Sequence, residues 1–145
     1  MATSVQIVFD CADPDKLAAF WAAALRYKIQ DPPEGFASWE AFLRDRGVPE
    51  DEWNDASAIV DPANALPRIY FQKMDTPKPR KNRLHLDLNI SGGWRVPHEE
   101  RVKKVEAEVA RLLTVGARKQ RTWEEADGGY WTVMLDPEGN EFCVQ

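Results

Sequence analysis

Cysteine is scarce in this chain of 145 residues, which has only Cys11 and Cys143. Two cysteines are too few for a disulfide framework, and a reducing compartment would keep both as thiols. The chain also lacks an apolar run near the ~20 residues that a membrane span needs, and its first residues lack the basic-then-apolar order of a signal peptide. We therefore expect a cytoplasmic protein with no membrane partner.

Positive charge is not in excess either. The formal net charge is −5, and broad nucleic-acid affinity depends on neutralising phosphates with Lys and Arg, so we expect no nucleic-acid partner. No glycine-rich phosphate loop, Ser-His-Asp order or nucleotide fingerprint occurs, which leaves a nucleotide cofactor without support. The hydrophobic share of 43%, with six Trp and six Phe, is enough to bury the core of one domain or of two small modules.

The end of the chain carries a pattern that the first half repeats more weakly. Residues 129–145 contain two strands joined by a turn at Asp136–Asn140. Around Val60–Asn64 the chain turns in a similar way and enters a strand at Arg68–Gln72. We interpret this as an internally duplicated βαβββ unit.

Each half begins with a strand and a helix. In the first, a strand at Val5–Cys11 precedes Asp13 as a helix N-cap and Pro14 at the first helical position. In the second, leucines alternate with polar residues over Leu84–Ile90, and a helix starts near Pro97 and ends at Gly116. The apolar helix faces, at helical spacing, are Leu17, Phe20, Trp21, Ala24 and Leu25 in the first half and Val102, Val105, Val109, Leu112 and Leu113 in the second. Further strands are predicted near 118–123, 130–135 and 141–145.

The fold class is therefore α+β, with paired βαβββ modules at about 1–75 and 83–145 in a single domain. A short helical insertion is predicted at about 36–56, within an acidic stretch, residues 31–66, of net charge −7. Residues 73–83 carry five basic side chains and one acidic one, a net of +4. Such a run is typical of a solvated linker. It could also attract an anionic ligand or meet the acidic insertion of another subunit.

Together, the paired units, the sequence Asp-Pro-Glu-Gly-Asn-Glu-Phe-Cys at 136–143 and the sequence Arg-Leu-His-Leu-Asp-Leu at 83–88 resemble the vicinal oxygen chelate (VOC) superfamily. Within it, the chain looks like the glyoxalase-like, bleomycin-resistance-like proteins common in actinobacteria. The resemblance covers nearly the whole chain apart from the insertion. It implies that the mixed sheets of the two modules curl around a shared cleft, often with a divalent metal, and that the protein is a homodimer.

The resemblance also implies four metal positions, which fall on Gln6, Gln72, His85 and Cys143. Two neutral amides are weak donors, and the last-strand positions lack the carboxylates that catalytic Zn, Fe, Ni or Mn sites favour. This departure argues against a glyoxalase I or an extradiol dioxygenase. A rescued Zn site would need the Cys143 thiolate, His85 and a swing of Asp87 or Asp10.

His85 and Asp87 lie two residues apart on one strand face, where Asp87 can orient His85 as an acid/base pair without a metal. The alternatives are metal ligation and a polar pair with a structural role only. His98, at a helix start, is predicted to be an exposed surface histidine, and Glu124, Glu125 and Asp127 to belong to a solvated loop or to offer a carboxylate at the cleft mouth.

We hypothesise that the cleft binds a small organic molecule without an intact glyoxalase I metal site. Aromatic side chains offer flat surfaces for such a ligand, although core packing is the alternative for each. The predicted ligand-binding residues are Gln6, Asp10, Gln72, His85, Asp87, Cys143, Trp39 and Trp131. The alternative function is a divalent-metal-dependent lyase, isomerase or dioxygenase with a non-standard ligand set, and a regulatory partner domain is a third class.

Overall fold

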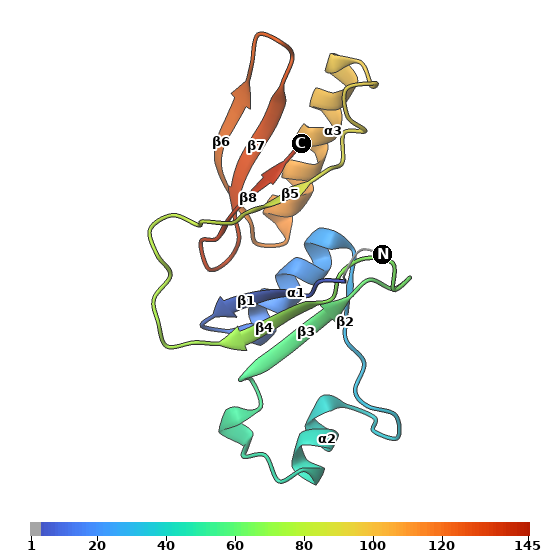
Figure 1. The fold of residues 1–145 in the computed structure, drawn as a ribbon, viewed down its shortest axis with the longest axis vertical. Helices are drawn as coiled ribbons and strands as arrows, with labels where there is room; N and C mark the ends of the chain where they lie inside the picture. Colours follow the sequence, from blue (N-terminus) through green and yellow to red (C-terminus); the bar gives the residue numbers. More distant parts are fainter. Residues whose placement is uncertain (1–3) are drawn as a thin grey trace. The chain divides into compact units, whose positions relative to one another are not determined.

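The computed structural model describes residues 4–145, which form two compact units, residues 4–78 and 79–145. Each unit has one long helix and one four-stranded mixed sheet (Figure 1). The strand order is β1-β4-β3-β2 in the first sheet and β5-β8-β7-β6 in the second. Both sheets thus place the first strand of the unit beside its last strand, which confirms the predicted α+β fold with paired modules.

The first unit runs from strand β1 (Ile7–Cys11) to helix α1 (Pro14–Leu25) and then to β2 (Lys28–Ile29), β3 (Ala56–Val60) and β4 (Ile69–Lys73). Strand β1 pairs with β4 in parallel, and the other pairs are antiparallel. Helix α1 covers one face of the sheet, where Trp21 packs on Phe9 at 5.4 Å between ring centroids. Leu17, Trp21 and Phe71 are at most 1% exposed, so this core forms as predicted from the helical spacing.

Helix α1 begins at the predicted cap. The Asp13 carboxylate accepts from the backbone N–H of Lys16 at 3.2 Å and from Nδ2 of Asn54 at 2.9 Å. The Asn54 bond and then the Lys16 bond lower the pKa of Asp13. Because Asn54 lies 41 residues away in the chain, the cap also ties the helix start to the end of the insertion.

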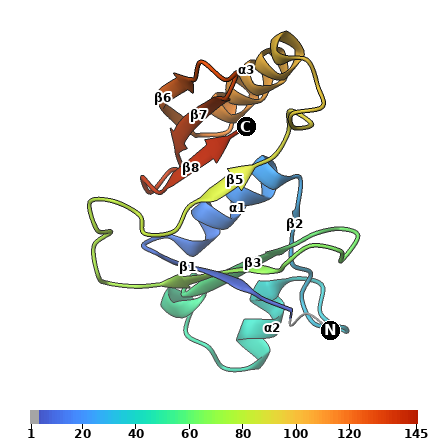
Figure 2. The ribbon, with the colours of Figure 1, turned by 45° about the horizontal axis from the view of Figure 1, so that its top comes forward.

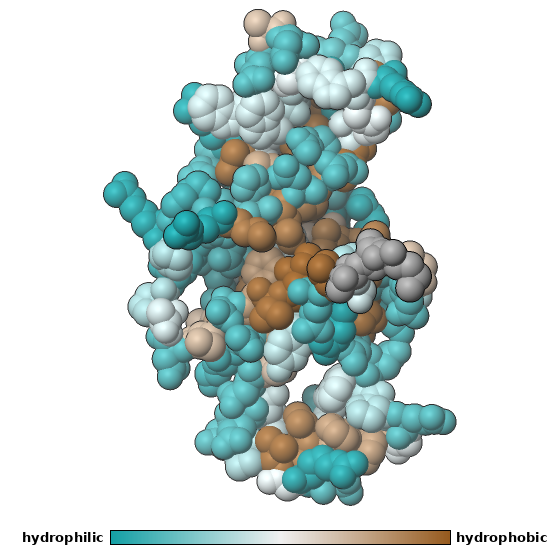
Figure 3. All heavy atoms as spheres, in the orientation of Figure 1, coloured by the Kyte–Doolittle hydropathy of each residue, from teal (hydrophilic) through white to brown (hydrophobic). Residues whose placement is uncertain are grey.

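The predicted helical insertion contains α2 (Trp39–Asp45), with Ser38 as its N-cap, and a 3-10 turn (Glu50–Glu52), with Pro49 as its N-cap. Its aromatic side chains pack on one another, and Phe42 meets Phe36 and Trp39 edge-on at 5.1 and 5.7 Å between centroids. No residue of α2 is fully buried. Figure 3 shows the apolar side chains of this part gathered at the foot of the view, beside hydrophilic ones.

The second unit contains β5 (Leu86–Leu88), helix α3 (His98–Thr114), β6 (Arg118–Glu124), β7 (Tyr130–Leu135) and β8 (Glu141–Val144). Helix α3 covers one face of the sheet (Figure 2). Four side chains of β7 and β8 point to α3 and are fully buried: Thr132, Met134, Phe142 and Val144. The residues between them along the strands point to the opposite face of the sheet, which no element of this unit covers and which we call the open face.

Strand β5 is shorter than the predicted Leu84–Ile90, and Leu84 is 71% exposed instead of packed on the helix. Leu113, predicted on the apolar face of α3, is 47% exposed. The helix ends as predicted, because Gly116 has φ of +110°, a conformation that costs glycine little and other residues more.

Candidate functional site

The open face of the second unit carries the chemistry-bearing side chains, and strand register explains why. Strand β5 pairs with β8 in parallel, with Asp87 opposite Cys143. Since side chains alternate between faces along a strand, His85 and Asp87 lie on the same side as Cys143 and Gln145. Strand β7 adds Trp131 and Val133 to this face, because Val133 lies opposite Cys143.

His85, Asp87 and Cys143 form a cluster in which one potential ligand atom of each lies within 4.8 Å of the others. Nε2 of His85 is 3.2 Å from Oδ1 of Asp87, and both side chains are about half exposed. We refer to these three residues as the His85 cluster. The structure thus brings together the predicted acid/base pair, His85 and Asp87, and two of the four predicted metal positions, His85 and Cys143.

The thiol of Cys143 is held in its protonated form. Burial, and then the charge and the hydrogen bond of Asp87, raise the pKa of Cys143 to about 11. A thiolate rather than a thiol is the nucleophile and the metal ligand. Cys143 is therefore a poor nucleophile near pH 7, and a metal would have to displace its proton.

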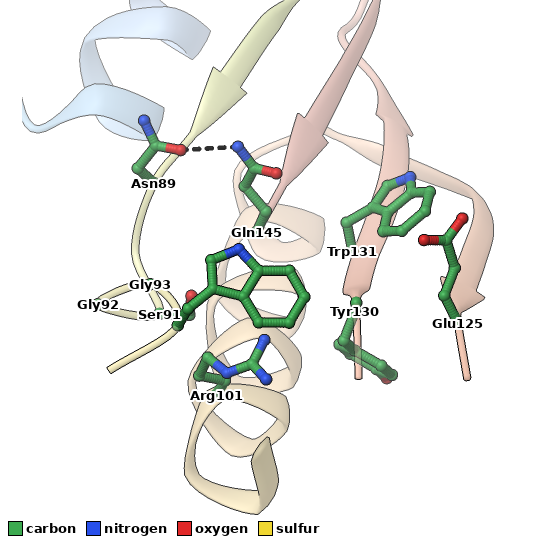
Figure 4. Close-up of a pocket in the computed structure, with 11 residues that line it drawn as sticks. Asn89, Ser91, Gly92, Gly93, Arg101, Glu125, Tyr130, Trp131 and Gln145 are labelled. Carbon is green, nitrogen blue, oxygen red and sulfur yellow. Dashed lines mark hydrogen bonds between the residues drawn. The ribbon is translucent and has the colours of Figure 1, made fainter. Parts of the chain in front are cut away.

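Gln145 joins the His85 cluster to a neighbouring cavity. Its Nε2 donates to Oδ1 of Asn89 at 2.8 Å and lies 3.4 Å from Oδ2 of Asp87. Figure 4 shows Asn89 and Gln145 joined at the top of this cavity, with Arg101 reaching in from α3 and Trp131 from β7. Polar side chains thus run without a break from His85 to the cavity.

The cavity, which we call the tryptophan cavity, has a volume of about 400 Å³. It is lined by Asn89, Ser91, Gly92, Gly93, Trp94, Arg101, Glu125, Gly129, Tyr130, Trp131 and Gln145. Three aromatic rings give it flat apolar walls, while two amides and two charged groups supply polar contacts. This mixture is typical of sites for small organic ligands.

The aromatic walls are held by their neighbours. Trp131 stacks against Trp123 at 6.3 Å between centroids and an interplanar angle of 17°, and the guanidinium of Arg121 lies 3.5 Å from the Trp123 ring centroid. The Tyr130 hydroxyl donates to the Glu106 carboxylate. Burial and this carboxylate raise the pKa of Tyr130 to about 12, so its ring stays neutral at physiological pH.

His98, expected to be a plain surface residue, connects α3 to the loop after β6. Its Nδ1 lies 3.1 Å from the carbonyl oxygen of Gly128 and its Nε2 lies 3.1 Å from Oε1 of Glu124. The same Gly128 carbonyl accepts from Nη2 of Arg101 at 3.1 Å. These contacts fix the loop that carries Glu125 and Gly129 at the rim of the tryptophan cavity.

The predicted residues of the first unit do not form one group. Gln72 lies opposite Asp10 and donates to it at 2.6 Å. Gln6, in contrast, accepts from Nη1 of Arg68. It lies four residues before Asp10 in the chain, which along an extended strand is ~13 Å, so Gln6 and Gln72 do not point at a common ligand.

The strand registers also correct the matching of Gln6 with His85. Phe71 pairs with Phe9, and Phe142 pairs with Leu86. If Phe71 is matched with Phe142, because each lies on the last strand of its unit and pairs with the first, then Asp10 matches Asp87 and Val8 matches His85. By these registers, Gln6 lies two residues before the position that matches His85.

Of the two predicted aromatic ligand contacts, Trp131 lines the tryptophan cavity and Trp39 does not. Nε1 of Trp39 donates to the carbonyl of Gln30 at 2.7 Å, and its ring packs on Phe42. The contacts of Trp39 are thus those of a residue that packs the insertion.

Arg101 is the main cavity residue that sequence reasoning missed. A signal was present, because Arg101 lies four residues before Val105 and so falls on the buried stripe of α3. A charged residue on an apolar helix face is unusual enough to indicate a special environment. Gln145 and Tyr130 were missed because only the sheet register and the loop after β6 bring them to the cavity.

Comparisons with known proteins agree with this architecture. A sequence model described as a glyoxalase-like domain matches residues 6–145. No curated protein sequence gives a significant match.

Among the residues that the structure describes, no helix is long and apolar enough to cross a membrane.

Several solved structures share the fold. A glyoxalase/bleomycin resistance protein/dioxygenase family enzyme from Burkholderia phytofirmans has a TM-score of 0.62 at 13% identity, with 96% of this chain and 94% of that chain covered. A mutant of the fosfomycin resistance protein FosX from Listeria monocytogenes, solved with Mn(II) and 1S,2S-dihydroxypropylphosphonic acid, also scores 0.62 at 13% identity, with coverage of 100% and 92%. A hypothetical protein, SA1046 from S. aureus, scores 0.57 at 17% identity, with coverage of 99% and 96%. At these identities the likeness concerns the fold alone.

Proposed function

Because the chain belongs to the glyoxalase-like domain family, we propose that it binds a small planar organic molecule in the tryptophan cavity. The observation that carries this proposal is the cavity itself, a space of about 400 Å³ walled by Trp94, Tyr130 and Trp131. Aromatic walls favour a flat ligand, since ring faces stack with offset geometry and bury large areas. Asn89 and Gln145 supply amide groups that can orient it.

The side chains at the metal positions that the family resemblance implies support binding without an intact glyoxalase I metal site. Of the first-unit positions that match His85 and Cys143 by strand register, Val8 has no ligand atom and Gln72 is a neutral amide, and the Cys143 thiol has a pKa of about 11. Neutral amides and a protonated thiol are weak partners for a divalent ion. The tryptophan cavity needs no metal to hold an aromatic ligand.

The experiment is a thermal-shift and calorimetric screen of planar organic molecules against the wild type, Trp131→Ala and Val133→Ala. Val133 lies on the same face of β7 as Trp131 but outside the cavity, so it is a matched control for lost apolar surface. We expect hits that stabilise the wild type and Val133→Ala but not Trp131→Ala. If no compound distinguishes Trp131→Ala from the wild type, the proposal is wrong.

A second candidate function, a divalent-metal-dependent lyase, isomerase or dioxygenase, is supported by the His85 cluster. An imidazole nitrogen, a carboxylate oxygen and a sulfur within 4.8 Å of one another are donor types that suit Zn, Fe or Ni, and three protein ligands leave a position open. A bound ion of this kind would supply Lewis-acid polarisation of a substrate oxygen. An ion can bind these side chains only when Cys143 is a thiolate and His85 is a neutral imidazole. Because protons compete with the metal for both groups, metal affinity should fall with falling pH.

Metal content separates the two candidates. Plasma mass spectrometry is applied to protein purified without chelator and then incubated with Zn, Fe, Ni or Mn, using the wild type, His85→Ala and His98→Ala. His98 lies outside the cluster and is the matched histidine control. About one ion per chain, lost in His85→Ala and kept in His98→Ala, would establish the metal candidate. No ion in any of the three proteins would eliminate it.

Self-association also belongs to the proposal. The net charge of −7 over residues 31–66 and of +4 over residues 73–83 favours contact between unlike segments of two copies at low salt. Light scattering coupled to size exclusion measures the mass directly, and a monomer at all salt concentrations would contradict self-association.

A further inference from the structure

Arg101 is a buried cation without an anionic partner. Arg101 is only 8% exposed. Nε donates to the carbonyl of Val96 and Nη2 to the carbonyl of Gly128, each at 3.1 Å, and the guanidinium lies 4.7 Å from the Trp94 ring centroid. Within residues 4–145, no carboxylate oxygen lies within the 4.0 Å of an ion pair with Arg101.

A buried charge with only neutral partners is costly. Carbonyl dipoles and a ring face offset part of the lost hydration, but a buried guanidinium is normally paired with a carboxylate or phosphate. Since Arg101 lines the tryptophan cavity, a ligand there can supply the missing anion. A carboxylate suits the planar fork of the guanidinium, which binds it through two parallel hydrogen bonds.

The other charges near Arg101 limit how many anionic groups the cavity accepts. Glu125 lines the cavity and is exposed, while Glu124 is bound to His98, and Lys104 pairs with Glu100 and donates to the carbonyl of Ser91 at 3.5 Å. The Glu125 carboxylate would repel a second acidic group on a ligand. The cavity thus combines one cation, one anion and aromatic walls.

We infer that the ligand of the tryptophan cavity is an aromatic acid with a single carboxylate, which Arg101 receives while the ring lies against Trp94 and Trp131. This inference rests on the proposed function and adds the chemical class of the ligand.

The first test needs no variant. Calorimetry compares 2-naphthoate with 2-naphthamide, which share the ring but differ in charge. We expect the wild type to bind naphthoate at least about tenfold more tightly, the range of one charge-assisted hydrogen-bonded pair. Equal affinity for the two probes, with both lost in Trp131→Ala, would overturn the inference and leave the proposed function standing.

Variants then test which side chain causes the difference in affinity between naphthoate and naphthamide. Arg101→Gln should lose the preference for naphthoate, while Lys103→Gln, which removes an exposed cation from the same helix, should keep it. Arg101 also supports the loop through Gly128, so Arg101→Gln could unfold the unit. Glu125→Gln, at an exposed position, therefore provides a second measurement, and it should raise the ratio of naphthoate affinity to naphthamide affinity several-fold.

The remaining outcomes are also decisive. If neither naphthalene probe binds but other compounds bind in a Trp131-dependent way, the aromatic-acid inference is wrong and the proposed function stands. If the wild type binds both probes equally and Glu125→Gln does not change the naphthoate affinity, Arg101 does not receive the ligand carboxylate. If no compound of the screen binds, the proposed function fails and the inference fails with it.

Discussion

At the residue scale, the open face of the second unit depends on a few close contacts between side chains that lie far apart in the sequence. The sequence predicted that His85 and Asp87 act together, because two residues of one strand with the same parity share a face. It did not predict the protonated state of Cys143, because that depends on burial and on Asp87 lying across the strand pair.

Cys143 should alkylate slowly at neutral pH, and its rate should keep rising up to about pH 10 without a plateau, because the pKa of its thiol is about 11. Asp87→Asn removes the charge that helps to raise this pKa, so the variant should react several-fold faster near pH 9. Iodoacetamide labelling followed by mass spectrometry measures both rates, and buried Cys11 is the internal control. A plateau near pH 8 in the wild type would contradict the raised pKa.

At the element scale, the helix caps and the last three strands of the second unit were predicted correctly, whereas the first strand of each unit is shorter than predicted. Asp13 starts one helix and Gly116 follows the end of another as expected, since capping depends on a residue and its immediate neighbours. Strand β5 is shorter than its leucine pattern suggested, because its pairing with β8 begins only at Leu86, opposite Phe142. Leu84, outside that pairing, is left exposed.

Asp13→Ala should lower the free energy of unfolding by about 1 kcal/mol, because the helix loses its N-cap acceptor, and Asp13→Ser should restore most of it. The pKa of Asp13 is lowered in the folded state. Its contribution is therefore present above the ordinary value of 3.8 and is lost as pH falls through the lowered folded-state value. Urea unfolding at several pH values measures both effects, and equal stability of Asp13→Ala and Asp13→Ser would rule out a capping role.

The loop between β5 and α3 depends on Gly92. A Cβ added there would lie 2.8 Å from Cγ2 of Val96, and φ is +89°. Gly93 has a φ of +74° but would meet nothing within 4 Å. Both Ala variants should lose about 1 kcal/mol through backbone strain, and Gly92→Ala should lose more and weaken ligand binding in the tryptophan cavity.

Thermal unfolding and calorimetry with a bound probe compare the two glycine variants. Gly93→Ala serves as the control for positive φ alone. Equal stability and equal affinity of the two variants would show that the Val96 contact does not shape the cavity.

At the scale of the whole molecule, the duplicated architecture is the main result. Phe71 and Phe142 occupy equivalent places beside the first strand of each unit, and both are completely buried. The duplication was visible in the sequence because the two turns and the strands after them resemble each other. The short strands β2 and β3 were not assigned residue ranges in advance, because the insertion between them breaks the repeat.

The connection between the two units should be the first site of tryptic cleavage. Residues 74–85 have no helix or strand and are mostly exposed, which favours proteolysis. Cleavage is expected after Arg80, Lys81 or Arg83, while the bond after Lys78 is protected by Pro79. Intact-mass analysis at early times identifies the cut, and first cleavage at Arg44 or Arg46 in the insertion would contradict the prediction.

The sequence by itself determined the fold class, the two modules, the helix ends and the membership of the glyoxalase-like family. The first three depend on helical and strand spacing, caps and turns, which act over a few neighbouring residues, whereas the family membership rests on the match of residues 6–145 to a glyoxalase-like domain model. Only the tertiary structure decided which side chains meet. The parallel pairing of β5 with β8 brings Asp87 to Cys143, and the packing of α3 leaves Arg101 buried beside Trp94 with neutral partners. Pairing between distant segments is set by the whole core, so no local pattern could have revealed it.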